Sequence, residues 1–90
     1  MTTKKGVGQR LRQAREDAGL TQQDASNRVG YSVRQIGRFE NKGTGDLFVI
    51  QAFAEAYGIH VIKIIIPPSE WHTAAIAIIP RQILDYFLHK

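Results

Sequence analysis

Cysteine is absent from this chain of 90 residues, and methionine and tryptophan occur once each. Without cysteine there is no disulfide framework and no zinc site made of thiolates. Long hydrophobic runs are missing too, because the longest, residues 60–66, contains Lys63 and is too short to cross a membrane. Lysines and arginines interrupt the amino-terminal stretch, which therefore does not resemble a signal peptide. These absences predict a soluble, cytoplasmic protein without membrane contact.

Signals for catalysis, metals and cofactors are also weak. The three histidines are far apart in the sequence and lack the spacing of metal ligands. The glycine pairs in residues 6–8 and 43–45 are not followed by the Gly-Lys-Ser/Thr of a phosphate-binding loop, so both are interpreted as turns. No pair of nucleophile and base stands out. The sequence therefore predicts a protein that is not an enzyme and that uses no metal or cofactor.

Positive charge is concentrated in the first half of the chain. The net charge is +4 overall, but residues 1–43 hold nine Lys or Arg against four Asp or Glu, whereas residues 44–90 hold three against four. A basic surface attracts polyanions and makes their binding depend on salt. Charge alone would also suit an ordinary solvated surface, so the choice of partner depends on the motif that carries the charge.

Two short helices are predicted between Thr21 and Asn41. Thr21 and Ser32 each precede apolar residues at helical spacing, and their hydroxyl groups can accept a hydrogen bond from a backbone N–H of the first turn. Gly30 falls between the two segments, where a chain leaving a helix often needs the left-handed conformation open to glycine. We expect helices over residues 22–29 and 33–41, joined by a turn of three residues.

Three segments in this region carry a more specific pattern. They are Leu20-Thr21-Gln22-Gln23, Gly30-Tyr31-Ser32 and Ile36-Gly37-Arg38-Phe39-Glu40-Asn41. Over about residues 6–58 the chain resembles the Cro/CI-type (Xre) helix-turn-helix family. The resemblance implies a mainly α, lambda-repressor-like fold of four to five helices that binds double-stranded DNA. One departure from the pattern is Gly37, since glycine inside a helix costs roughly 1 kcal/mol relative to alanine.

The same resemblance implies which residues read the DNA bases. Val33, Arg34 and Arg38 occupy the base-facing positions of the second helix, the recognition helix. An arginine can donate two hydrogen bonds to guanine O6 and N7, and a valine can pack on a thymine methyl group. The resemblance further implies an internal salt bridge between Arg15 and Glu40.

Phosphate contacts are expected on either side of these base-reading residues. The resemblance implies such contacts for Gln22 and Asn41, and Ser32 and Lys42 are placed to fix the register in the same way. Tyr31 either touches the DNA backbone or shields the turn. A flexible arm at residues 4–5 is expected to add positive charge.

Two further helices complete a predicted DNA-binding domain over residues 1–58. Residues 6–18 carry apolar side chains at helical spacing, and Gly19 offers a stop. After the glycine-rich loop, Asp46 can cap another helix, whose apolar residues face the core until Gly58 ends it.

The sequence changes character after Gly58. Residues 59–66 are dense in β-branched side chains and predict a β-strand, which two prolines stop. A lone strand needs a partner, either residues 73–79 folding back as a hairpin or the same strand of a second subunit. Ser69 can instead cap a short helix, and the sequence does not decide between these possibilities. Residues 80–89 are expected to form a last helix.

Residues 59–90 are predicted to form a dimerisation extension. They hold nine of the eleven isoleucines, an apolar surface that either completes the core of one subunit or lies between two subunits, and we favour the second. The candidate interface residues are Ile62, Ile64, Ile66, Trp71, Ile83 and Phe87. Two-fold pairing sets two recognition helices roughly 34 Å apart, one turn of DNA.

These features together predict a homodimeric repressor that reads a palindromic operator through the major groove. The alternative is an antitoxin that resembles the HipB group, whose members couple a similar helix-turn-helix to a dimerising strand. Such a protein would bind a toxin partner and repress its own operon. A module that binds RNA is less favoured, because no aromatic residues alternate with the arginines for base stacking.

Overall fold

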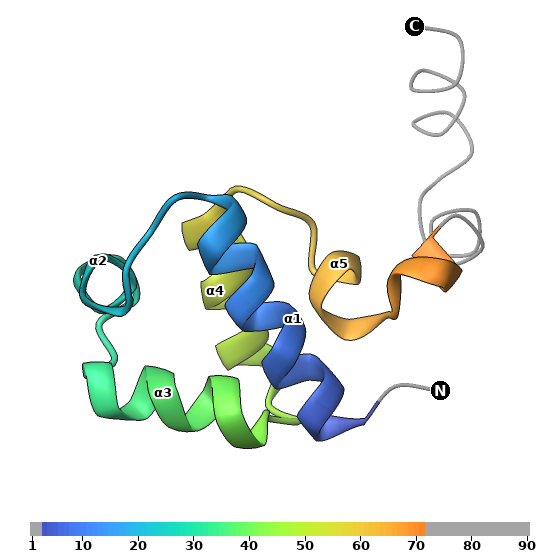
Figure 1. Cartoon of the computed structure of the whole chain (residues 1–90), viewed down its shortest axis with the longest axis horizontal. Helices are drawn as coiled ribbons and strands as arrows, with labels where there is room; N and C mark the ends of the chain where they lie inside the picture. Colours follow the sequence, from blue (N-terminus) through green and yellow to red (C-terminus); the bar gives the residue numbers. More distant parts are fainter. Residues whose placement is uncertain (1–2, 72–90) are drawn as a thin grey trace, which may run out of the picture.

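The computed structural model describes residues 3–71, which form five α-helices and one short 3-10 helix (Figure 1). In chain order they are α1 (Lys4–Asp17), α2 (Gln22–Val29), α3 (Val33–Lys42), α4 (Leu47–Tyr57), α5 (Ile62–Ile65) and η1 (Pro68–Glu70). α1 contacts α3, α4 and α5, while α2 packs on α3 and α4 (Figure 1). The described part of the chain is mainly α, as the sequence predicts.

α2 and α3 begin at the two residues that the sequence predicts as caps. Thr21 Oγ1 accepts the Asp24 N–H at 3.1 Å, and the Asp24 carboxylate accepts the Thr21 N–H at 3.0 Å. The same reciprocal pair joins Ser32 and Gln35, with distances of 3.1 and 2.8 Å. Each pair satisfies two backbone donors that a helix start would otherwise leave unpaired. Gly30, with φ +82°, ends α2 in the left-handed conformation.

α1 begins two residues earlier than the sequence predicts. Thr3 caps it, since its Oγ1 accepts the Gly6 N–H at 3.0 Å. Lys4 and Lys5 therefore belong to the first turn of a helix and do not form a flexible arm. Residues 6–8 are also helical, so their interpretation as a turn was wrong. Asp46 caps α4 as expected, because its Oδ1 accepts the N–H groups of the second and third helical residues.

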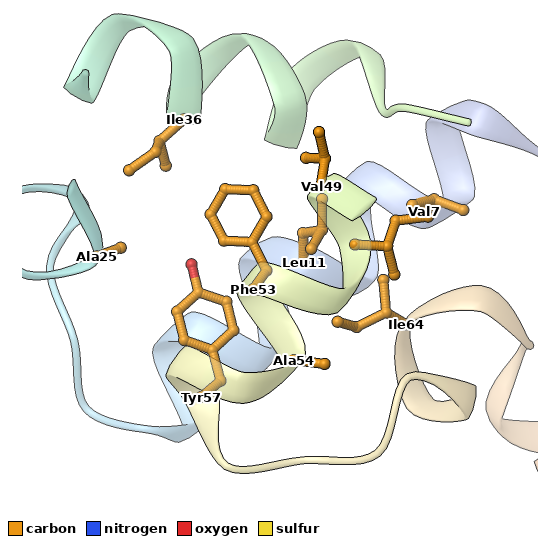
Figure 2. Packing of buried hydrophobic residues seen from close by; sticks show 10 residues of the cluster. Val7, Leu11, Ala25, Ile36, Val49, Phe53, Ala54, Tyr57 and Ile64 are labelled. Carbon is orange, nitrogen blue, oxygen red and sulfur yellow. The ribbon is translucent and has the colours of Figure 1, made fainter. Parts of the chain in front are cut away.

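The hydrophobic core draws residues from all five α-helices and is centred on α4 (Figure 2). Its buried members are Val7, Leu11, Ala25, Ile36, Val49, Ile50, Phe53, Ala54, Tyr57 and Ile64. Phe53 lies among the rings of Tyr31, Phe39 and Tyr57, with centroid distances of 5.9, 5.9 and 5.7 Å. Such pairs add roughly 0.5–1.5 kcal/mol each beyond the area they bury. The aromatic cluster thus joins α4 to α3 and to the turn before α3.

α1 and α3 approach each other closely at two glycines. A Cβ atom on Gly8 would lie 2.5 Å from the Glu40 carbonyl oxygen and 2.7 Å from that of Phe39. Gly43 has φ +77°, and a Cβ atom there would collide with the carbonyl group of Lys4. Glycine is required at both positions, because any side chain would push the helices apart. The contact fixes the end of α3 against the first turns of α1.

The predicted β-strand at residues 59–66 is wrong, since Ile62–Ile65 form helix α5. The preference of β-branched residues for strands is weak, and tertiary burial overrides it here. Ile64 is fully buried in the core. The Arg10 guanidinium donates from Nε to the Ile64 carbonyl at 2.6 Å and from Nη2 to the Ile65 carbonyl at 3.0 Å. These bonds satisfy acceptors that the end of a helix leaves unpaired.

The candidate dimer-interface residues have different environments. Ile62 and Ile64 are buried within the chain itself, with 6% and 0% exposure, so in this conformation they have no surface for a partner. Ile66 and Trp71 are half-buried, and Trp71 Nε1 donates to the Ile66 carbonyl at 2.6 Å. Ile83 and Phe87 lie outside the described residues, as do the segments 73–79 and 80–89.

Two absences hold for residues 3–71. None of their helices is both long enough and apolar enough to cross a membrane. They also contain no group of three or more His, Asp or Glu side chains arranged to hold a metal ion.

The close approach at Gly8 predicts opposite outcomes for two helical glycines. Gly8→Ala should lower the free energy of unfolding by about 2 kcal/mol, since overpacking costs roughly 1–3 kcal/mol. Gly37→Ala is the matched control, because a Cβ atom there meets only the Gln22 Nε2 atom, at 3.8 Å. It should raise the free energy of unfolding by about 0.5–1 kcal/mol. Urea denaturation measures both, and a stabilising Gly8→Ala would contradict the packing described.

The hydroxyl group of Tyr57 is buried and has no hydrogen-bond partner among the described residues. Burial raises the pKa of Tyr57 to about 12; the negative charge of Glu40 adds to this rise, and Arg15 opposes it. The pKa in the folded state thus exceeds the ordinary value of 10.0. The stabilisation linked to neutral Tyr57 is therefore complete below pH 10 and is lost as the pH rises through about 12.

Tyr57→Phe should leave stability at pH 7 unchanged or raise it by up to about 1 kcal/mol, because it removes an unpaired buried hydroxyl. It should also reduce the loss of stability between pH 10 and 12. Urea denaturation at pH 7 and across that alkaline range tests both parts. A loss of more than about 1 kcal/mol at pH 7 would mean that the hydroxyl group has a partner.

Candidate nucleic-acid interface

α3 has a buried face and an exposed face. Ile36 and Glu40 point into the molecule and are buried. The residues on the solvent side are Val33, Arg34, Gln35, Arg38, Asn41 and Lys42, all exposed. Val33, at the start of the helix, is 37% exposed. The helical period of 3.6 residues makes this separation, since the core positions lie four apart.

Arg34 and Arg38 lie one helical turn apart on the exposed face. Neither forms a hydrogen bond or an ion pair with another residue in the described part of the chain. Two like charges at this spacing repel slightly, so a bound anion relieves an unfavourable interaction. Binding of a polyanion to this face of α3 is therefore electrostatically favourable.

The acidic side chains of α1, α2 and α3 lie away from this surface or are already hydrogen-bonded. Glu40 is the acidic residue of α3, and it is buried. Asp24 bonds to the N–H and hydroxyl of Thr21, which lowers its pKa. Glu16 and Asp17 lie at the carboxyl end of α1, the end away from α3 (Figure 1). The positive charge of α3 thus has no acidic neighbour on the same helix face.

A buried ion pair holds α3 to α1. Arg15 Nε donates to Glu40 Oε2 at 2.7 Å and Arg15 Nη2 to Glu40 Oε1 at 3.2 Å. A third bond runs from Arg15 Nη1 to the Leu20 carbonyl at 2.8 Å. The hydrogen bonds to Glu40 raise the pKa of Arg15 above its ordinary value. The planar guanidinium group therefore binds α1, the loop before α2 and α3 in one geometry.

Gln22 joins the same network from α2. Its Nε2 donates to Glu40 Oε1 at 3.1 Å, and the side chain is half-buried. Because Gln22 is the first residue of α2, this bond places the start of α2 beside α3. The backbone N–H groups of the first turn are donors without helical partners, a common site for phosphate oxygens. The side chain proposed as a phosphate ligand thus also positions the helix start.

The turn between α2 and α3 places Tyr31 and Ser32 differently. The Tyr31 ring is half-buried and packs edge-on against Phe39 at 5.3 Å, which suits the shielding role. Its carbonyl accepts the Ser26 hydroxyl at 2.6 Å. Ser32 is exposed, and its oxygen accepts the Gln35 N–H while its hydroxyl proton stays available for a phosphate.

The structure adds Gln35 and Thr44, which sequence reasoning missed, and gives Lys4 a fixed place beside them. A hollow of about 280 Å³ beside the end of α3 is lined by Lys4, Gln35, Arg38, Phe39, Gly43, Thr44 and Gly45. Lys4 and Thr44 come from segments far apart in the sequence, and the close contact at Gly43 brings them together. No local sequence motif predicts this hollow, because it depends on how α1 and α3 pack.

The buried pair predicts a large effect of removing Glu40. Glu40→Ala should lower the free energy of unfolding by about 3–5 kcal/mol, because it leaves the Arg15 charge buried without a partner. The control is Glu16→Ala, since Glu16 pairs with Arg12 at 3.8 Å on the surface and such pairs contribute about 0–1 kcal/mol. Chemical denaturation compares them. Equal losses would contradict a buried pair.

Comparisons with known proteins agree with this geometry. Residues 7–61, more than half of the chain, match the family described as helix-turn-helix domain. Comparison with curated proteins gave no significant match, and neither did comparison with solved structures. The matched region contains α1 from residue 7 onward and all of α2, α3 and α4, with the exposed arginines on α3 and the turn that joins α2 to α3. A helix-turn-helix domain indicates a DNA-binding regulator, and the chain belongs to the helix-turn-helix domain family.

Proposed function

We propose that the chain is a sequence-specific regulator of transcription, a homodimeric repressor that reads a palindromic operator in double-stranded DNA. The observation that supports this best is the outer face of α3, where Arg34 and Arg38 are exposed and unpaired within the described chain. The buried Glu40 on the opposite face holds the helix in place. The proposed function is binding without catalysis, because reading DNA requires only hydrogen-bond donors and positive charges in fixed positions.

α3 fits the major groove in size and in chemistry. Its ten residues span about 15 Å, and the groove, about 12 Å wide, admits an α-helix. Arg34 and Arg38 donate to guanine O6 and N7, each good pair discriminating by about 1–3 kcal/mol. Val33 packs on a thymine methyl group. Gly37, between the arginines, leaves room for the backbone to approach the bases.

Phosphate contacts flank the base-reading residues and set the register. Asn41 and Lys42 lie at the end of α3, and Ser32 lies at its start. The first turn of α2, with Gln22, faces the phosphates of the groove edge through its free N–H groups. These contacts carry no sequence information but give most of the affinity and its salt dependence.

Two-fold pairing of two copies matches a palindromic operator. Within the described chain, Ile66 and Trp71 remain partly exposed for such a contact, and Ile83 and Phe87 stay predictions. The antitoxin alternative has less support, because it was based on a dimerising strand at residues 59–66 and Ile62–Ile65 are helical. A toxin partner is therefore not the reading we favour.

Selection of bound duplexes from a random pool, repeated at two salt concentrations, tests the proposal. We expect an enriched inverted repeat at both concentrations, with weaker binding at the higher one. Retention of all sequences alike would contradict sequence-specific reading.

Variants of α3 should separate base reading from charge. Arg34→Ala and Arg38→Ala should each relax the preference at one operator position, costing about 1–3 kcal/mol on the selected duplex and little on unrelated DNA. Lys42→Ala is the matched control, since it should weaken all duplexes alike and reduce the salt slope by about one. Fluorescence anisotropy with selected and scrambled duplexes gives both numbers. Full selectivity in both arginine variants would rule out α3 as the base-reading helix.

A further inference from the structure

A second hollow, of about 190 Å³, lies between α1 and the segment that follows α4, and we call it the α1–α5 hollow. In Figure 1, α5 and η1 lie on the other side of α1 from α2. The proposed contacts with DNA, which come from α2 and α3, do not use this hollow. The apolar part of its wall includes Ala14, Ala18, Ile59, Pro68 and Trp71.

The size and the lining of the α1–α5 hollow suit a small molecule. Pockets for drug-sized ligands have roughly 300–1,000 Å³, so a ligand of about one or two rings fits here. Such sites are mostly apolar and carry a few polar groups that fix the orientation of the ligand. Water against an apolar wall finds few hydrogen-bond partners, so its replacement by an apolar ring is favourable.

The polar groups at the rim of the hollow carry an excess of positive charge. Lys63 is exposed, and its Nζ atom lies 5.7 Å from the centroid of the Trp71 ring. Lys63 forms no ion pair within the described part of the chain. Arg10 lines the hollow as well. Asp17, the acidic residue of the lining, already accepts the Gln13 amide at 2.8 Å.

We propose that the α1–α5 hollow binds a small aromatic carboxylate. The ring lies against Trp71 and the apolar wall, and the carboxylate reaches Lys63. These two side chains are neighbours, so a ring that bears a carboxylate on a short link matches both at once. A cationic ligand would meet the like charges of Lys63 and Arg10. Charge complementarity therefore selects the anion.

Occupation of the hollow also affects the pairing of two copies of the chain. Trp71 is one of the partly exposed residues that the described chain offers for that contact. The ligand and a second copy compete for it, so the ligand lowers the affinity for an inverted repeat and not for one half-site. This consequence rests on the proposed function, whereas the binding of the ligand does not.

Three probes with one ring system test the selectivity for charge: indoleacetate, indoleacetamide and tryptamine, which are negative, neutral and positive. Trp71 is the sole tryptophan, so its indole N–H gives one signal in the isotope-labelled full chain. Indoleacetate should shift this signal. It should bind about fivefold more tightly than the amide, the factor that roughly 1 kcal/mol for a partly exposed charge gives, and tryptamine should bind most weakly.

Two lysine variants locate the charge that the ligand meets. Lys63→Gln should remove the advantage of indoleacetate and leave the affinity for the amide unchanged. Lys5→Gln is the matched control, because it removes the same charge from an exposed position that does not line the hollow. It should keep the full preference for the anion. Thermal unfolding of both variants should match that of the original chain, because both side chains are exposed.

Three results would overturn the inference. The first is a Trp71 signal that indoleacetate does not move, as expected if another part of the chain or a second copy fills the hollow. The second is equal affinity for the acetate and the amide. The third is a preference for the anion that survives in Lys63→Gln or is lost equally in Lys5→Gln.

The coupling to DNA is measured separately. Saturating indoleacetate should lower the affinity for the selected inverted repeat by about fivefold or more and leave a single half-site unchanged. Ligand binding without this effect overturns the coupling alone. If the chain binds no duplex selectively, the proposed function fails, and the Trp71 signal still decides whether the hollow binds the carboxylate.

Discussion

The arrangement of the helices depends on the buried ion pair between Arg15 and Glu40. The carboxylate of Glu40 also accepts the amide of Gln22, and the guanidinium group reaches the Leu20 carbonyl, so one cluster ties α1, α2 and α3 together. A buried pair of this kind contributes little net stability compared with apolar residues of equal size, but breaking it is costly. Its role here is geometric, because the ion pair forms only when α3 has one particular orientation about its own axis.

That rotation determines what the surface of α3 offers. With Glu40 and Ile36 turned inward, Arg34 and Arg38 are turned outward. Glu40, the acidic residue of α3, is buried in the ion pair with Arg15 and therefore does not neutralise the charges of Arg34 and Arg38. The glycine contact between α1 and α3 adds a second restraint at the carboxyl end of α3, so both the rotation and the position of α3 are fixed. If α3 binds DNA as proposed, its rigid placement lowers the entropy lost on binding.

Local chemistry made the first four helices predictable from sequence, whereas the remainder depends on contacts between distant residues. Thr21, Ser32 and Asp46 cap helices as expected, because capping involves neighbours three residues apart or fewer. The strand assigned to residues 59–66 failed, since isoleucine favours strands locally while burial against α1 and bonds from Arg10 select a helix. The outward-facing positions of Val33, Arg34 and Arg38 on α3 were implied by the family resemblance, and all three are exposed. The hollow that includes Lys4 did not, because it requires the packing at Gly43.

The most direct test of a DNA-reading α3 is the change of backbone amide chemical shifts when a selected duplex is titrated into the labelled protein. The account predicts that the largest shifts occur in α3, in the first turn of α2 and in residues 43–45, with small shifts along α5. Largest shifts on the side of α1 that contacts α5, with α3 unchanged, would contradict it.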